Sequence, residues 1–434
     1  MTPFSAIFVP DELQEAVSDR AWLQGMLDAE RALANAGAAT GLVPADAAAR
    51  IGDACRAELY DPRELARDGR AVGNPAEPLV LALRKAVGDE AADWVHYGAT
   101  SQDIVDTAAM LVSRRAVELV LAELDRLAGA CADLARAHRS TPMAARTLLQ
   151  QAVPTTFGLK AAGWLVALIE ARRRLAVVRH ERLAAQLGGA AGTLAALGED
   201  GLEVTRRYAE ELGLVEPVVP WHANRVRVGE LGAALDVAAG AAAKVGRDIV
   251  LLAQSEVGEV AEAAGGGSST MPHKRNPVRS TLAVACARLA HAHAEVLLAE
   301  QDHEHERAVG GWHAEWEALS GALAFTGGAI AAAADAVSGL EVDPDRMRVN
   351  LEAGGGLVVA ERISFALSDR LGRRQAHDLV AEAARAPSFR EALLADERVA
   401  LSGAELDALL DPAGYLGSAE ALVDRALVEW DGSR

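Results

Sequence analysis

The chain has 434 residues, of which 51% are hydrophobic but only 4% aromatic, and its formal net charge is -19 at pH 7. A chain of this length can bury a large core, and with so few aromatic side chains that core must consist of Ala, Leu and Val, which favours closely packed helices. The negative charge excludes nucleic acid and anionic membrane surfaces as partners, because both bind through a basic face. An anionic ligand would therefore need a local cationic pocket.

The three cysteines, Cys55, Cys131 and Cys286, are widely spaced and form no CxxC pair. This usage predicts buried free thiols in a reducing compartment. Residues 1–10 lack the basic and apolar regions of a signal peptide, and we find no later apolar run of membrane-spanning length without charges. We expect a soluble, cytoplasmic protein that does not enter a membrane.

Residues 1–100 are expected to form an N-terminal helical domain. Apolar residues between Asp19 and Ala38 recur on one helical face, which predicts an amphipathic helix. Pro44, Pro62 and the Asn74-Pro75 pair should separate further short helices, because the residue before a proline disfavours helical geometry.

Residues 101–340 differ in character, because long Ala-rich stretches follow one another with few breaks. Helices are predicted over 103–139, 154–187, 228–263, 278–301 and 314–338. Segments such as 231–240 are apolar on more than one face, and in a soluble chain such helices are often buried by other subunits. A smaller C-terminal helical domain, 341–434, completes the chain, and we detect no strand-like alternation.

The segment 265–277, with the sequence GGGSSTMPHKRNP, is the most informative part of the chain. Its glycines make the backbone costly to order, so a mobile loop is expected until a ligand fixes it. Hydroxyls, an amide and two positive charges then follow within a few residues, which suits an anionic substrate. A solvated Gly/Ser linker would explain the glycines but leaves Met271-Pro272 and the cationic end unexplained.

This loop resembles the GSSxMPxKxNP signature of the fumarase/aspartase superfamily, which includes argininosuccinate lyase, adenylosuccinate lyase and 3-carboxy-cis,cis-muconate cycloisomerase. Every fixed position of the pattern is present. The resemblance implies an all-α, three-part fold over essentially the whole chain, with a central long-helix bundle that forms a homotetramer. It also implies a small anionic polycarboxylate substrate, no cofactor and no metal.

The segment 96–103, HYGATSQD, precedes the first long helix. Thr100 and Ser101 are strong N-cap residues, and a helix N-terminus offers free N–H groups and partial positive charge to a carboxylate. Capping alone would explain them, but the segment resembles the first motif region of the superfamily, which implies that Thr100 and Ser101 bind substrate. His96 matches a histidine found there in adenylosuccinate lyases and in the cycloisomerases.

The segment 146–158, RTLLQQAVPTTFG, resembles the second motif region, and its Gln150 is expected to bind a carboxylate. In fumarases and adenylosuccinate lyases a histidine follows the threonine, and in the latter it is assigned as the general acid. Here that residue is Leu148, which can neither donate nor accept a proton.

The leucine restricts the leaving group. Amine and hydroxide benefit from protonation as they leave, whereas a carboxylate, the base of an acid with a pKa near ~4, leaves unaided. The segments 146–151, 311–316 and 18–20 also resemble the cycloisomerases. The family implied is therefore 3-carboxy-cis,cis-muconate cycloisomerase, which forms 4-carboxymuconolactone in protocatechuate breakdown. The alternatives are a related lyase on a substituted succinate, of the nitrosuccinate or adenylosuccinate type, and a non-catalytic bundle of the lens-crystallin kind.

The resemblance also implies the roles of individual residues. Superfamily practice assigns the catalytic base to Ser268, and a serine hydroxyl needs activation by loop N–H groups and by Lys274. The residues expected to hold the substrate carboxylates are His96, Thr100, Ser101, Gln150, Ser269, Asn276 and Arg307.

Other charged residues leave two interpretations open. Arg307 matches a substrate-binding arginine of adenylosuccinate lyases, but it could equally form a surface ion pair with Glu304 or Glu306. Arg225 could clamp a second substrate carboxylate or form an ion pair at a helix start. His291/His293 and His303/His305 are two residues apart, so on a helix their rings diverge and cannot share one metal ion.

Overall fold

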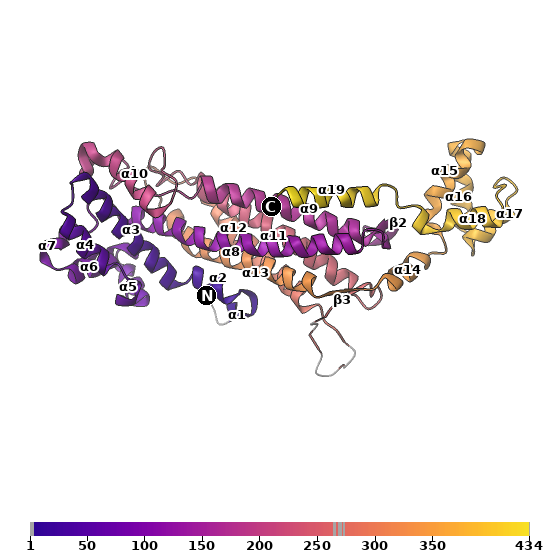
Figure 1. Cartoon of the computed structure of the whole chain (residues 1–434), viewed down its shortest axis with the longest axis horizontal. Coiled ribbons are helices and arrows are strands. Elements are labelled where there is room, and N and C mark those ends of the chain that lie inside the picture. Colours follow the sequence, from indigo (N-terminus) through magenta and orange to yellow (C-terminus); the bar gives the residue numbers. More distant parts are fainter. Residues whose placement is uncertain (1–3, 264–265, 268–270, 272–273, 434) are drawn as a thin grey trace. The chain divides into compact units, whose positions relative to one another are not determined.

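The computed structural model describes residues 4–263, 266–267, 271 and 274–433, and most of them are helical (Figure 1). The N-terminal part consists of short helices around one longer helix, α3. Their bounds are α1 Ser5–Phe8, α2 Asp11–Ala16, α3 Asp19–Thr40, α4 Ala45–Ala54, α5 Pro62–Asp68, α6 Ala76–Val87 and α7 Asp89–Ala92.

The predicted helix starts in this part are confirmed. α3 begins after Ser18, whose hydroxyl accepts a hydrogen bond from the Ala21 N–H, and it ends before Gly41, which has φ 83°. α4, α5 and α6 begin at or directly after the three predicted proline breaks. Pro62 occupies the first turn of α5, where its missing N–H costs nothing.

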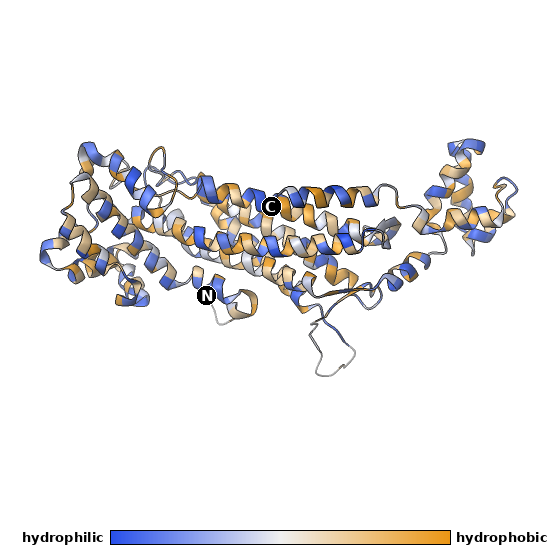
Figure 2. Ribbon diagram, in the orientation of Figure 1, coloured by the Kyte–Doolittle hydropathy of each residue, from blue (hydrophilic) through white to orange (hydrophobic). Residues whose placement is uncertain are grey.

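The long helices follow, and apolar segments alternate with polar ones along them (Figure 2). Their bounds are α8 Ser101–Ala137, α9 Phe157–Glu181, α10 Gly201–Leu212, α11 Val226–Leu252, α12 Val278–Ala299 and α13 Gly311–Ser338. Arg172 of α9 bonds Asp125 of α8, and the Thr326 hydroxyl of α13 donates to the Leu235 carbonyl of α11. The core between them is mainly Ala, Leu and Val, as the composition predicts.

Two short antiparallel strand pairs were not expected. β1 (Pro142–Thr147) pairs with β2 (Gln150–Thr156), and β3 (Val260–Glu262) pairs with β4 (Leu340–Val342). Because β2 occupies the start of the predicted helix 154–187, α9 begins only at Phe157. Likewise α11 ends at Leu252 and not at residue 263, because the following segment turns into β3.

The C-terminal part has its own apolar core, which includes Ile363, Leu379 and Phe389. Its helices are α14 Pro344–Glu352, α15 Ala360–Leu371, α16 Arg373–Ala383, α17 Phe389–Ala395, α18 Gly403–Leu410 and α19 Ala419–Gly432. Ser402 and Glu405 form a reciprocal capping box at the start of α18.

The chain divides into two compact units. The first contains residues up to Asp125, Glu170–Ala243 and Leu282–Ala332, and the second contains Arg126–Ile169, Lys244–Thr281 and the chain from Ala333 onward. The division into 1–100, 101–340 and 341–434 remains a prediction. Cys55, Cys131 and Cys286 are buried free thiols, as expected.

Two helices of the described chain, α12 and α13, are long and apolar enough to cross a membrane by length and composition alone, against our expectation from the sequence. In α13, 83% of the most apolar window is buried, as in the core helix of a soluble protein. In α12 only 33% of that window is buried within the chain.

Candidate functional site

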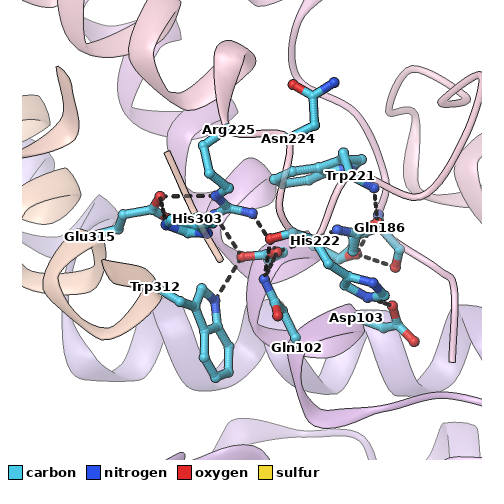
Figure 3. Close-up of polar contacts among 12 residues, drawn as sticks. Gln102, Asp103, Gln186, Trp221, His222, Asn224, Arg225, His303, Trp312 and Glu315 are labelled. Carbon is cyan, nitrogen blue, oxygen red and sulfur yellow. Dashed lines mark hydrogen bonds and ion pairs between the residues drawn. The ribbon is translucent and has the colours of Figure 1, made fainter. Parts of the chain in front are cut away.

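The first motif is held in place by a buried carboxylate, that of Asp103. One of its oxygens accepts hydrogen bonds from the backbone N–H groups of Thr100 and Gly189, both at 2.9 Å. The other oxygen lies 2.6 Å from His222 Nε2, in the segment that precedes α11 (Figure 3). Asp103 therefore fastens the start of α8, where Thr100 and Ser101 lie, to two segments that are distant in sequence.

A fully buried arginine, Arg225, pairs with Asp106, which lies three residues after Asp103 on α8. Arg225 binds Asp106 at 2.8 and 3.1 Å, and its Nε donates to Glu315 at 2.9 Å, with a second, shorter contact between the same two side chains. Trp312 Nε1 also donates to Asp106 at 3.0 Å, and the guanidinium lies over the Trp221 ring. We call Asp106, Arg225 and Glu315 the buried charge cluster. Its carboxylates occupy the guanidinium, so Arg225 forms an ion pair at the start of α11 and does not clamp substrate.

The buried charge cluster contains two carboxylates for one guanidinium. Burial raises the pKa of Glu315 to about 7, although its hydrogen bond from Arg225 acts in the opposite direction. The buried ring of His303 lies 3.5 Å from Glu315, and neither ring nitrogen has a hydrogen-bond partner among the described residues. Burial and the charge of Arg225 lower the pKa of His303, so this ring adds no positive charge at neutral pH.

Arg307 is held differently from Arg225. Its Nη1 donates to Gln102 Oε1 at 3.0 Å, and its Nη2 donates to the carbonyls of Gly189 at 3.3 Å and Ala190 at 2.7 Å. All three acceptors are neutral. Within the part of the chain that the structure describes, Arg307 forms no ion pair with Glu304 or Glu306, and Glu304 instead accepts the Val309 N–H.

The arginine thus remains available to an anion. A guanidinium that is fixed in position but not neutralised favours binding of a carboxylate, and it does so within a chain of strongly negative net charge. This geometry favours the substrate-binding interpretation of Arg307 over the surface ion pair.

His96, the first residue of the first motif, has a left-handed conformation, with φ 64°. Its Nδ1 is 2.6 Å from Oε1 of the buried Glu30. Burial lowers the pKa of His96, but the charge and hydrogen bond of Glu30 outweigh burial and raise it above the ordinary value. His96 is therefore oriented by a buried carboxylate that the motif gave no sign of.

The second motif forms the β1–β2 hairpin. Arg146 binds the fully buried Glu259 at 2.6 and 2.9 Å, which anchors the hairpin. Thr147 pairs with Gln150 across a two-residue turn, Leu148-Leu149. Gln150 is exposed, and Leu148 is 96% exposed, so Leu148 lines no pocket among the described residues of its own chain.

The signature loop is closed at its base by two backbone hydrogen bonds between Gly266 and Asn276, at 3.0 and 3.1 Å. Arg275 binds Glu341 at 2.9 Å and the Glu262 carbonyl at 3.0 Å. Its guanidinium therefore stabilises the base of the loop. The Lys274 backbone N–H donates to the Met271 carbonyl. Ser268 and Ser269, the expected base and its neighbour, lie outside the described residues.

Of the predicted site residues, the first unit brings together His96, Thr100, Ser101 and Arg307. Gln150, Lys274 and Asn276 belong to the second unit. Sequence reasoning missed Gln102, Asp103, Asp106, His222 and Glu315 as parts of one network. The sequence did contain an indication of this network. Asp103 and Asp106 flank the apolar pair Ile104-Val105 on a helix expected to be buried, and buried carboxylates require polar partners.

Comparisons with known proteins identify the family of the chain. Residues 9–290 match the family model described as Lyase, and residues 356–426 match the model described as Adenylosuccinate lyase C-terminus. The chain therefore belongs to this lyase family, the fumarase/aspartase superfamily that its loop resembles.

Individual relatives cover nearly the whole chain. A 3-carboxy-cis,cis-muconate cycloisomerase of Pseudomonas aeruginosa is 51% identical over 98% of this chain and 96% of its own length. A nitrosuccinate lyase of Streptomyces davaonensis is 48% identical over 96% of this chain and 92% of its own. The solved 3-carboxy-cis,cis-muconate lactonizing enzyme of Pseudomonas putida is 45% identical, with a TM-score of 0.93 over 99% of both chains. The predicted all-α fold of the superfamily is confirmed.

Proposed function

We propose that this chain catalyses the cycloisomerisation of 3-carboxy-cis,cis-muconate to 4-carboxymuconolactone, without a cofactor, in protocatechuate breakdown. The observation that carries the proposal is the position of Arg307 beside the N-terminus of α8, where its guanidinium is fixed by neutral acceptors and no carboxylate of the described residues neutralises it. This arrangement suits a substrate with several carboxylates. Among possible polycarboxylates we choose 3-carboxy-cis,cis-muconate because similar proteins are named for this activity.

The chemistry agrees with the second motif. One substrate carboxylate oxygen adds to a carbon of the double bond while a proton is delivered to the adjacent carbon, so all atoms stay in the product. In the reverse direction a base removes that proton, the C–O bond breaks and the carboxylate leaves as an anion. A carboxylate needs no acid to leave, so Leu148 in place of a histidine is no obstacle.

The proposed proton-transfer residue is Ser268, activated by loop N–H groups and by Lys274 when water is excluded. Carboxylates are held by Arg307 and by the residues expected from the motifs: His96, Thr100, Ser101, Gln150, Ser269 and Asn276. The negative charge that develops on the substrate is stabilised by the cationic group of Lys274.

A second candidate is elimination of nitrite from nitrosuccinate. It is favoured by the 48% identity to a nitrosuccinate lyase, and nitrite, like a carboxylate, leaves as a stable anion without protonation. Adenylosuccinate cleavage expels an amine and is disfavoured by Leu148. A non-catalytic role is disfavoured by the complete signature loop.

Ultraviolet absorbance tests these candidates with one preparation of enzyme. Loss of the conjugated diene of 3-carboxy-cis,cis-muconate is expected, together with a single lactone product. Formation of fumarate from nitrosuccinate with a higher kcat/KM than lactone formation would reject the proposal in favour of the second candidate. An Arg307→Met variant should lose most of its kcat/KM on whichever substrate is used, because a charge-assisted hydrogen bond is removed.

The proposal includes a cytoplasmic homotetramer. Apolar side chains remain half exposed on the long helices, including Val177 of α9, Val237 of α11, and Leu289 and Leu298 of α12. Helices of this kind favour burial by other copies of the chain. Light scattering is expected to give the mass of four chains, with activity lost on dissociation. A fully active monomer would rule this assembly out.

A further inference from the structure

The side-chain amide of Gln102 lies between the buried charge cluster and Arg307. Its Nε2 donates to Asp106 at 3.0 Å and to the His222 carbonyl at 2.9 Å, while its Oε1 accepts from Arg307 at 3.0 Å. An amide nitrogen has two N–H bonds, and both are directed to these acceptors. Only the carbonyl oxygen can therefore face Arg307, and the orientation of the amide is fixed.

Because the amide of Gln102 is neutral, it can hold Arg307 without neutralising its charge. A carboxylate at this place would form an ion pair with Arg307 and compete with a substrate carboxylate for the same donors. The amide instead presents the negative end of a dipole. It links Arg307 to the rigid cluster around Asp106 but leaves the positive charge of the arginine available.

Gln102 is itself 1% exposed, so it cannot contact a ligand. We propose that Gln102 is a positioning residue, which orients Arg307 toward a substrate carboxylate and preserves the charge of the guanidinium for that substrate. The inference rests on the proposed function in one respect, namely that the ligand is a polycarboxylate.

The test compares Gln102→Leu and the isosteric Gln102→Glu with a matched control, Gln186→Leu. Gln186 is equally buried, and its amide accepts the Trp221 N–H at 2.9 Å and lies 3.5 Å from Asp106, but it does not contact Arg307. In Gln102→Leu, removal of a charge-assisted hydrogen bond is expected to raise KM by about 10- to 100-fold, with a smaller effect on kcat. In Gln102→Glu the new carboxylate should pair with Arg307 and compete with the substrate, so KM should rise as well. Gln186→Leu should lower the melting temperature but leave KM within about twofold of the wild type.

A double-mutant cycle separates positioning from general destabilisation. If Gln102 acts through Arg307, then Gln102→Leu should have little further effect on ligand affinity in an Arg307→Met background. Additive effects of the two substitutions would overturn the inference. So would KM values for both Gln102 variants that match the Gln186→Leu control.

Calorimetric titration with tricarballylate, a saturated tricarboxylate, keeps this inference separate from the proposed function. If the wild type binds tricarballylate but does not convert the muconate, the proposed function is wrong, and the dissociation constants of the Gln102 variants decide the inference alone. If the wild type converts the muconate but binds no tricarballylate, the KM values of the Gln102 variants decide the inference. If it does neither, both are wrong.

Discussion

Replacement of Glu315 by glutamine should remove a pH dependence of stability that the buried charge cluster creates. The pKa of the Glu315 carboxyl is raised from 4.5 to about 7 in the folded chain. Between pH 4.5 and about pH 7 the folded chain therefore retains a proton that the unfolded chain releases. The stability contributed by this group is therefore complete below about pH 4.5 and is lost as the pH rises through about 7. A shift of this size in a largely buried group corresponds to at most about 3 kcal/mol.

Glu315→Gln retains the shape of the protonated acid and cannot ionise, but its amide nitrogen cannot accept the second of the two hydrogen bonds from Arg225. At pH 5 the variant should therefore be at most as stable as the wild type, and between pH 5 and pH 8 it should gain stability relative to it. Thermal unfolding at one protein concentration measures the difference in stability between the variant and the wild type at each pH. Glu317→Gln, an exposed position on the same helix, is the control and should follow the wild type. Parallel curves for Glu315→Gln and the wild type would refute the reasoning.

Three further results are expected. Ser268→Ala should lower kcat at least about 100-fold without altering the fold, because proton transfer contributes on the order of 10² to 10⁴, and a near-normal kcat would reject Ser268 as the base. Leu148→His should not accelerate lactone formation, because the attacking carboxylate is already ionised; rate profiles between about pH 5 and 8, where histidine titrates, would expose any new dependence. Gly189→Ala should lower the melting temperature and raise KM, because φ at this position is 69° and an added Cβ would lie 2.9 Å from the Gly98 carbonyl oxygen, so an unchanged enzyme would contradict this account.

Much of the fold could be predicted from local patterns. α12 and α13 were placed within three residues at each end, because long runs of apolar residues with helical periodicity leave little choice. The β1–β2 hairpin was missed because its turn, Leu148-Leu149, has none of the Gly or Asn residues that mark two-residue hairpins. The end of α11 was missed for a related reason, since β3 has only three residues and pairs with a strand far along the chain.

The candidate site was predictable only where a motif is contiguous. Thr100, Ser101 and the signature loop could be found because their residues are neighbours in sequence. The partners of Asp103 and Asp106 could not, because His222 and Arg225 are more than a hundred residues away, and only the fold brings them together. Arg307 is an example. Its residue type allowed either substrate binding or a surface ion pair, and the absence of a carboxylate partner in the described chain favours substrate binding.

The turn at the tip of the β1–β2 hairpin has a consequence for the stability of the chain. Leu148 and Leu149 both have positive φ, 48° and 64°, a conformation that costs an L-residue with a Cβ roughly 1 to 2 kcal/mol. Their side chains recover almost none of this through burial, because both are largely exposed. An Asn-Gly pair would adopt the same turn with less strain. The chain thus maintains, at a tip anchored by the Arg146–Glu259 ion pair, two apolar residues that its own folding free energy disfavours.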